Sequence, residues 1–360
     1  MGNAQHLTGK ILKGHKTGIG WEVVESLNTP TAVKSTESNS HVYKVKDQAS
    51  GRFAFLKAAD VDFIGGEESL LVRLKALLMH HEFETCVSDH CHGNNMDRVC
   101  LAIDHGDAVI EANGVREAVF YLVFELADGD IRDQIFTAEQ WTVQRKFRLL
   151  HQVAVGLSQL HSVKVSHNDL KPPNVLMYAD DHKVSDLGQA TREDLIAPHD
   201  WNAVVGDPRY APPEALYSFD GDPGARLLPN RLRQCGDLYL LGSLMHFLFS
   251  GRMMTPCILE RLHPVHLPSF EGEGWEGPYN DLIPFWREAM SEEFTALRKA
   301  LAQRNDFDAR SIDQIITFLS QLCDPDPELR GHPLDQVDGI RTFNLQRYIS
   351  AFNVLSHRLQ

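Results

Sequence analysis

The strongest constraint on the fold is a change in apolar periodicity along the chain. In the first third, apolar and polar residues alternate in 20–27, 41–47 and 52–60, which is typical of antiparallel strands with one face in water. Beyond Ala127, apolar residues recur every three to four positions, as in "FRLLHQVAVGLSQLH", which is typical of amphipathic helices. The sequence therefore predicts a small antiparallel β lobe followed by a larger, mainly helical lobe, an α+β architecture.

One long helix is predicted within the β lobe. It begins near Glu67, and the leucines that follow share one helical face and are expected to be core residues: Leu70, Leu71, Leu74, Leu77 and Leu78. Two strand-like segments come next and end in the turn-rich "ADGD". This break sets the expected division of the chain: an N-terminal extension at 1–19, the first lobe at 20–126, the second lobe at 127–345 and the end of a C-terminal helix at 346–360.

Charge and cysteine content argue against several classes of protein. A formal net charge of -14 opposes binding to nucleic-acid phosphates or anionic membranes, and no run of Lys and Arg offsets it. The longest apolar stretch, 238–249, is too short to cross a bilayer and predicts a buried helix. Six cysteines without an apolar leader are typical of a reduced protein. We therefore expect a cytoplasmic protein with no nucleic-acid or membrane partner.

A polar cluster lies in "SHNDLKPPNVL", which contains Asp169, Lys171 and Asn174. Transfer of the γ-phosphoryl group of ATP needs a base for the attacking hydroxyl, a cation beside the phosphate and hard oxygen ligands for Mg²⁺. Asp169, Lys171 and Asn174 match these needs in that order. A second metal carboxylate, Asp186, follows a predicted hairpin in "NVLMYADDHKVSDLG". The spacing therefore predicts phosphoryl transfer.

A lysine in the β lobe completes the predicted set. Lys57 ends the strand-like "AFLK", where its ammonium group can bind the α- and β-phosphates. A carboxylate at the start of the leucine-rich helix is expected to hold this lysine. We assign that role to Glu67, because the leucines follow it on one helical face, with Glu68 as the alternative.

In this order, the segments resemble the motifs of a eukaryotic-type Ser/Thr protein kinase. "AFLK", "HNDLKPPN" and "SDLG" resemble V-A-I-K, H-R-D-L-x-x-x-N and D-F-G. "GDPRYAPPE" resembles the A-P-E segment, which implies that its Glu214 pairs with Arg330 in "DPDPELRG". Asp237 resembles the aspartate that opens a buried helix and holds the catalytic loop. The resemblance implies a bilobal protein kinase-like fold with a small sheet lobe and a larger helical lobe.

The resemblance also implies cofactors and a substrate. ATP and Mg²⁺ are the expected cofactors, with the backbone of Glu125 and Ala127 at the adenine and Asp130 at the ribose. Asn174 and Asp186 are the expected metal ligands. A lysine two residues after the base, as Lys171 is after Asp169, is typical of Ser/Thr kinases. The expected partner is therefore a protein with a Ser or Thr acceptor. The long first-lobe helix is a candidate site for a further partner.

The loop over the phosphates departs from the family, because Ser35, Glu37 and Ser40 stand at its three glycine positions. A glycine-free loop favours weaker nucleotide handling, and a pseudokinase or nucleotide-binding scaffold is therefore the first alternative function. A small-molecule phosphotransferase is the second, although the A-P-E, buried-aspartate and late-arginine elements favour a protein substrate. The histidines and cysteines of "HHEFETCVSDHCHG" have irregular spacing for a zinc site.

The activation segment, 189–211, also departs from the family. Asn168 replaces the arginine that receives a phosphate there, and Thr191 is the only Ser or Thr in the segment. We therefore expect packing, including that of Trp201, to order the segment without phosphorylation. Asp207 replaces a threonine and is expected to pair with Lys171.

Overall fold

The computed structural model describes residues 2–28, 40–63, 69–132, 141–200, 202, 204–217, 230–269, 273–337 and 340–358 of the 360-residue chain. The chain divides into two compact units. The first unit contains Met1–Asn95 and Cys100–Asp128, and the second contains Met96–Val99 and Gly129–Gln360. Each unit has a hydrophobic core of its own.

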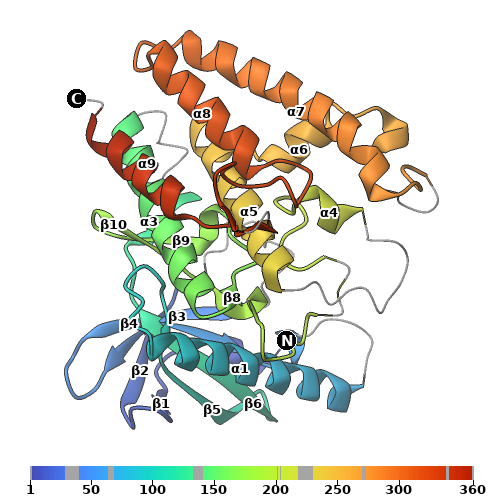
Figure 1. The fold of residues 1–360 in the computed structure, drawn as a ribbon. Coiled ribbons are helices and arrows are strands. Elements are labelled where there is room, and N and C mark those ends of the chain that lie inside the picture. The colour runs from blue at the N-terminus through green and yellow to red at the C-terminus, as the bar shows by residue number, and fades with distance from the viewer. Residues whose placement is uncertain are drawn as a thin grey trace. The chain divides into compact units, whose positions relative to one another are not determined.

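The first unit is built on a six-stranded antiparallel sheet, drawn in blue to teal in Figure 1. Its strands are β1 (Ile11–Lys13), β2 (Gly20–Ser26), β3 (His41–Asp47), β4 (Phe53–Ala59), β5 (Ala102–Ala112) and β6 (Val115–Glu125), in the order β1-β2-β3-β4-β6-β5. Alternate residues of these strands are buried, as at Val23, Val45 and Leu56. The three strands predicted from period-two alternation are confirmed to within a residue or two of their ends.

Residues before Gly20, expected as an extension, contribute to this first unit. They form the 3₁₀ helix η1 (Asn3–Gln5) and β1, and they bury Ala4 and Leu7. The carboxylate of Asp104 on β5 holds the β1–β2 connection, because it accepts hydrogen bonds from the backbone N–H of Lys16 and from Trp21 Nε1 at 3.1 and 2.9 Å. The short 3₁₀ helix η2 (Val61–Phe63) follows β4.

The long helix of the first unit is α1 (Leu70–His92), and Ser69 caps its N-terminus by accepting a hydrogen bond from the backbone of Val72. The expectation that its leucines form core is wrong for most of them. Leu70 and Leu71 are 60% and 62% exposed, and only Leu77 of the five is buried. The buried residues of the second half, Phe83, Val87 and Cys91, instead recur every four positions. The helix therefore packs on β5 and β6 mainly through its C-terminal half.

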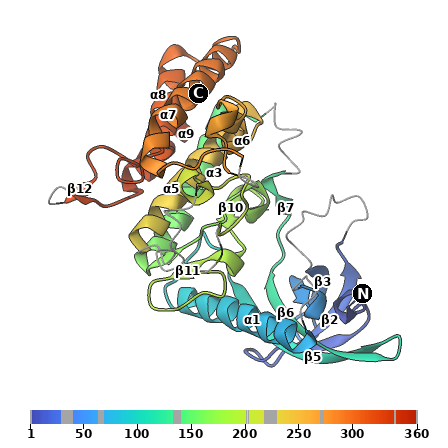
Figure 2. The same ribbon diagram turned by 90° about the vertical axis from the view of Figure 1, so that its right-hand side faces the viewer.

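The second unit is mainly helical, as Figures 1 and 2 show. Its helices are α3 (Val143–Ser162), α4 (Pro213–Leu216), α5 (Asn230–Ser250), α6 (Met254–Leu259), α7 (Tyr279–Ala302), α8 (Ala309–Leu322) and α9 (Gln346–Arg358), with 3₁₀ helices η4 (Pro172–Asn174), η5 (Leu187–Gln189) and η7 (Pro264–His266). Helix α5 is buried over most of its surface and contacts α3, α6 and α8. This confirms the buried helix predicted from 238–249.

The second unit also contains short strands, and two of them flank the polar cluster. They are β7 (Gly129–Asp130), β8 (Val165–Ser166), β9 (Val175–Tyr178), β10 (Asp181–Val184), β11 (Thr191–Arg192), β12 (Gln336–Val337) and β13 (Ile340–Arg341). Strands β9 and β10 form the predicted hairpin, and β7 pairs with β9. Among the described helices, none combines the length and apolar character that a membrane crossing requires.

Candidate active site

The polar cluster lies in the loop between β8 and β9. A buried carboxylate, Asp237 on α5, fixes the start of this loop by accepting hydrogen bonds from the backbone N–H groups of His167 and Asn168, each at 2.8 Å. His161 Nε2 is also 2.8 Å from Asp237. The expected hold on the loop is therefore confirmed. The expectation that Asp237 opens its helix is wrong, because α5 begins at Asn230 and Asp237 lies inside it.

Asn168 has a positive φ of 61°, a conformation that asparagine tolerates better than most residues. Its side-chain nitrogen donates hydrogen bonds to the carbonyl oxygen of Gln189 at 2.9 Å and to Thr191 Oγ1 at 3.0 Å. The loop is thus tied to the segment after β10 by a neutral side chain. Thr191 is 3% exposed, so its hydroxyl is enclosed by this contact.

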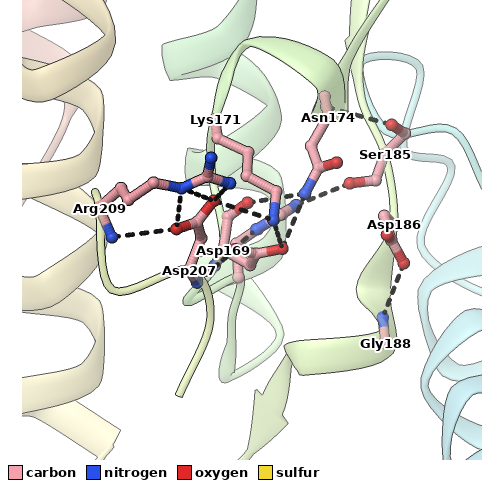
Figure 3. A network of polar contacts seen from close by, with 9 residues as sticks. Asp169, Lys171, Asn174, Ser185, Asp186, Gly188, Asp207 and Arg209 are labelled. Carbon is pink, nitrogen blue, oxygen red and sulfur yellow. Dashed lines mark hydrogen bonds and ion pairs between the residues drawn. The ribbon is translucent and has the colours of Figure 1, made fainter. Parts of the chain in front are cut away.

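Asp169 is the centre of the network in Figure 3 and is 6% exposed. Its Oδ2 lies 3.0 Å from Lys171 Nζ and accepts a 3.0 Å hydrogen bond from Asn174 Nδ2. Burial raises the pKa of Asp169, as does the charge of Asp186, while Lys171 opposes that rise. The three residues predicted from "HNDLKPPN" are therefore brought together around one carboxylate.

Asp207 joins the network from the activation segment. Its backbone N–H donates to Asp169 Oδ1 at 2.9 Å, and its carboxylate lies 3.8 Å from Lys171 Nζ, which confirms the expected ion pair. Gly206 makes this approach possible, since it has a φ of +82° and a Cβ there would lie 2.5 Å from the carbonyl oxygen of Asn168.

Arg209 binds the other side of the Asp207 carboxylate through Nε and a terminal nitrogen, at 2.9 and 2.5 Å (Figure 3). Burial alone would raise the pKa of Asp207, but the hydrogen bonds from Arg209 and the charge of Lys171 hold it below its usual range. Asp207 therefore stays ionised between two cations near neutral pH. Sequence reasoning missed Arg209, although its position two residues after Asp207 was a usable signal.

Asn174 and Asp186 form an oxygen donor set suited to Mg²⁺. Asn174 uses its amide nitrogen for both contacts to Asp169, which orients its amide oxygen away from them. Asp186 has a φ of 63°, and its Oδ1 accepts a 3.4 Å hydrogen bond from the backbone of Gly188. The backbone N–H of Ser185 donates to the carbonyl oxygen of Asn174 at 2.9 Å, which ties the two segments together. One carboxylate and one amide are typical of a magnesium site completed by phosphate oxygens and water.

The lysine of the first unit has a carboxylate partner other than the predicted one. Lys57 on β4 lies 3.6 Å from Glu84 Oε1 on α1, and their side chains are 22% and 13% exposed. Glu67 and Glu68 lie outside the described residues. The leucine pattern predicted the partner of Lys57 at the start of the helix and so missed Glu84. The structure shows that α1 packs on the sheet through its second half, which contains Glu84.

The other predicted nucleotide residues are divided between the units. In the first unit, Ser40 is buried beside β3, Glu125 ends β6, and Ala127 lies two residues later. In the second unit, Asp130 on β7 accepts a 2.8 Å hydrogen bond from the backbone of Arg132 and lies 3.5 Å from its guanidinium. Ser35, Glu37 and Trp201 lie outside the described residues.

The predicted structural ion pair is present in the second unit. Arg330 is fully buried and donates two hydrogen bonds to the carboxylate of Glu214, at 2.6 and 2.8 Å. This confirms the pairing of the A-P-E glutamate with the late arginine. The histidines and cysteines of α1 do not gather: over the described ranges, no group of three or more His, Cys, Asp or Glu side chains could hold a metal ion.

Comparisons with known proteins agree with these arrangements. A family model described as the protein kinase domain matches residues 38–333. The probable serine/threonine-protein kinase fhkD of Dictyostelium discoideum is 29% identical over 51% of this chain and 24% of its own length. A serine/threonine-protein kinase H1 homolog of Danio rerio is 27% identical over 64% of this chain and 53% of its own length. Calcium/calmodulin-dependent protein kinase type II of Caenorhabditis elegans is 24% identical over 71% of this chain and 33% of its own length.

The chain spans a quarter to about half of the length of these relatives. The family match is broader, because it covers well over half of the chain and includes the loop of Asp169, the hairpin before Asp186 and both residues of the Glu214–Arg330 pair. The chain therefore belongs to the protein kinase domain family.

Proposed function

We propose that this chain is a Ser/Thr protein kinase that transfers the γ-phosphoryl group of ATP to a hydroxyl group of a protein. The observation that carries the proposal is the buried Asp169 carboxylate, contacted at 3.0 Å by both Lys171 and Asn174. Family membership implies ATP and a divalent metal. Relatives whose names specify serine/threonine kinases support the choice of acceptor.

In the second unit, Asp169 accepts the proton of the attacking hydroxyl. Its raised proton affinity, which follows mainly from burial, favours that role. Lys171 is held by the carboxylates of Asp169 and Asp207, so its ammonium group is placed beside the transferred phosphoryl group. Asn174 and Asp186 would hold Mg²⁺, which when bound neutralises phosphate charge.

In the first unit, Lys57 binds the α- and β-phosphates, and its contact with Glu84 keeps the ammonium group in place. We assign the backbone of Glu125 and Ala127 to the adenine edge and Ser40 to the loop over the phosphates. Asp130 of the second unit is assigned to the ribose. These assignments rest on the motif positions that the chain shares with its family.

The proposed activity is tested by transfer of ³²P from γ-labelled ATP to a generic protein and to a panel of sugars and aminoglycosides. Labelling of serine and threonine, lost in Asp169→Asn and in Asp186→Asn, is the expected result. Stabilisation by Mg-ATP without any transfer would indicate a scaffold, and labelling of the small molecules alone would indicate a small-molecule phosphotransferase. Either outcome contradicts the proposal.

We also propose that activation-segment phosphorylation does not control the activity. The side chain of Asn168 donates a hydrogen bond to the hydroxyl group of the buried Thr191. This bond connects the loop to the activation segment, as a phosphate group on the segment would otherwise do. A second tie joins Arg233 and Asp200 at 2.6 Å, with side chains only 9% and 5% exposed. Thr191→Val is therefore expected to change the transfer rate less than about tenfold, since one neutral hydrogen bond is lost. A larger loss in Thr191→Val, or phosphate found on Thr191 in the active protein, overturns this proposal.

A further inference from the structure

A cavity of about 300 Å³ lies in the second unit, at the end of the β9–β10 hairpin opposite Asn174 and Asp186. Its walls come from α3, the hairpin turn and α9, elements that lie side by side in Figure 1. Strand β9 has four residues, so it separates the cavity from Asn174 by roughly 13 Å. The cavity therefore belongs to none of the chemistry described above.

Two arginines of α3 give the cavity a cationic wall. Arg145 and Arg148 both line it and, three residues apart on the helix, share one face. The Arg145 guanidinium stacks over the ring of Trp141, with its central carbon 3.9 Å from the ring centre, which sets its orientation. The guanidinium group of Arg148 makes no hydrogen bond or ion pair with any other described residue.

His182, which also lines the cavity, is 2% exposed. Its Nδ1 lies 2.6 Å from Gln152 Oε1, and Gln152 uses its amide nitrogen to donate to Asp181 at 2.9 Å. The Gln152 oxygen can only accept, so Nδ1 of His182 carries the proton and Nε2 has the lone pair. Over the described part of the chain, this buried Nε2 has no hydrogen-bond partner.

Burial and the charges around His182 explain why its ring is neutral. Burial, together with the charges of the nearby Arg145, Arg148 and Arg98, lowers the pKa of His182 to about 4, and Asp181 opposes this shift. At neutral pH the ring is therefore a neutral acceptor beside two guanidinium groups. Arg98 is itself neutralised by Asp181, at 2.9 Å. A ligand that contacts Arg145, Arg148 and His182 together must combine negative charge with a hydrogen-bond donor.

We propose that this cavity binds free inorganic phosphate. At neutral pH this ion offers anionic oxygens for Arg145 and Arg148, and it also keeps one O–H that can donate to His182 Nε2. A carboxylate or sulfate has the charge but no such proton. Ser356 and Gln144 on the same walls add neutral hydrogen-bonding groups.

One lining group opposes this ligand. Asp180, at the hairpin turn, places a carboxylate on the cavity wall, and its charge repels an anion. The proposal therefore predicts opposite effects from two exposed positions of the same cavity. Removing the charge of Arg148 weakens phosphate binding, and removing the charge of Asp180 tightens it.

The test is calorimetric titration of the full chain with inorganic phosphate and, separately, with sulfate, both at pH 7.5. We expect saturable phosphate binding, and sulfate weaker by at least about tenfold, because it lacks the donor for His182. Arg148→Gln is expected to weaken phosphate binding by about tenfold or more, and Asp180→Asn to strengthen it. Arg310→Gln, which alters an exposed arginine on α8 of the same unit, is the matched control and leaves binding unchanged.

Three results overturn the proposal. They are the absence of saturable phosphate binding, equal affinity for sulfate and phosphate, and phosphate binding that Arg148→Gln and Asp180→Asn leave unchanged. If neither substitution changes phosphate binding, the phosphate binds at another part of the chain. None of the three bears on phosphoryl transfer, since neither substituted residue belongs to the proposed catalytic network.

Discussion

Asp169 is buried among charged neighbours, and this burial determines its response to pH. Burial raises the pKa of its carboxyl group above the usual value, so the folded chain keeps this proton at a pH where the unfolded chain has lost it. Between these two pKa values the folded state binds more protons, and its stability falls as pH rises. The ionised Asp169 thus costs stability at neutral pH while it serves as the base.

Asp169→Asn is therefore expected to reduce the rate of transfer while stabilising the fold. The rate falls by about 10²–10⁴-fold, the usual contribution of a general base. The free energy of unfolding rises more at pH 7 than at pH 4.5, because only the wild type carries the buried charge at pH 7. Urea unfolding at both pH values and initial rates measure this. A variant that is equally destabilised at both pH values contradicts the argument, and the exposed Asp313→Asn is the control.

Glu84 provides a second test at the residue scale. Its carboxylate lies 3.6 Å from Lys57 Nζ and is largely buried, so Glu84→Gln removes the charge that positions the lysine. We expect the KM for ATP to rise by about tenfold, corresponding to loss of one partly buried charge contact. Glu82→Gln is the matched control, since Glu82 is exposed on the same helix two residues away. If both variants changed the KM for ATP equally, the assignment of Glu84 as the residue that positions Lys57 would be wrong.

At the scale of elements, the Glu214–Arg330 pair connects the α4 segment with the turn after α8. Arg330 is fully buried and makes four hydrogen bonds through its guanidinium group to oxygen atoms of Glu214, Asp324 and Cys235. Removing the carboxylate leaves a buried guanidinium without its counter-charge. This is a structural role, and it differs from that of the residues around Asp169.

Glu214→Gln is expected to lower the free energy of unfolding by about 3–5 kcal/mol, the usual cost of breaking a buried ion pair. Asp313→Asn breaks the exposed Arg298–Asp313 pair between α7 and α8 and is expected to cost at most about 1 kcal/mol. Urea unfolding compares the two. Transfer activity per folded molecule should survive in Glu214→Gln, and its loss in fully folded protein would show that the pair acts on catalysis.

Elements were predictable where one local pattern determines them. Strands β2, β3 and β4 follow from alternation, and α5 follows from an apolar run long enough for a buried helix. The exposed leucines at the start of α1 show the limit of prediction from periodicity. An apolar period identifies the apolar face of a helix but does not identify what packs against that face. Helix α1 is longer than the part of it that packs on β5 and β6. Which of its residues contact the sheet depends on tertiary structure.

At the scale of the whole molecule, contacts between distant segments were predictable only when a motif specified both partners. The Glu214–Arg330 and Lys171–Asp207 pairs were inferred from the family resemblance. Glu84 belongs to the site through packing alone, and no local pattern in the sequence marks it, whereas Arg209 lies only two residues after its partner Asp207. The cavity beside His182 likewise exists only because α3, α9 and the β9–β10 hairpin come together.

The two units have separate hydrophobic cores, one in the sheet around Val45 and Leu56 and one around α5 with Leu244. We therefore expect calorimetric unfolding in two transitions, since chains with separate cores depart from two-state behaviour. Leu56→Ala should lower the midpoint of one transition and Leu244→Ala that of the other, because each leaves a cavity that costs about 2–5 kcal/mol in its own core. Both side chains are at most 1% exposed, so the substitutions are matched in burial. A single transition that both variants shift equally would mean that the chain unfolds as one cooperative unit.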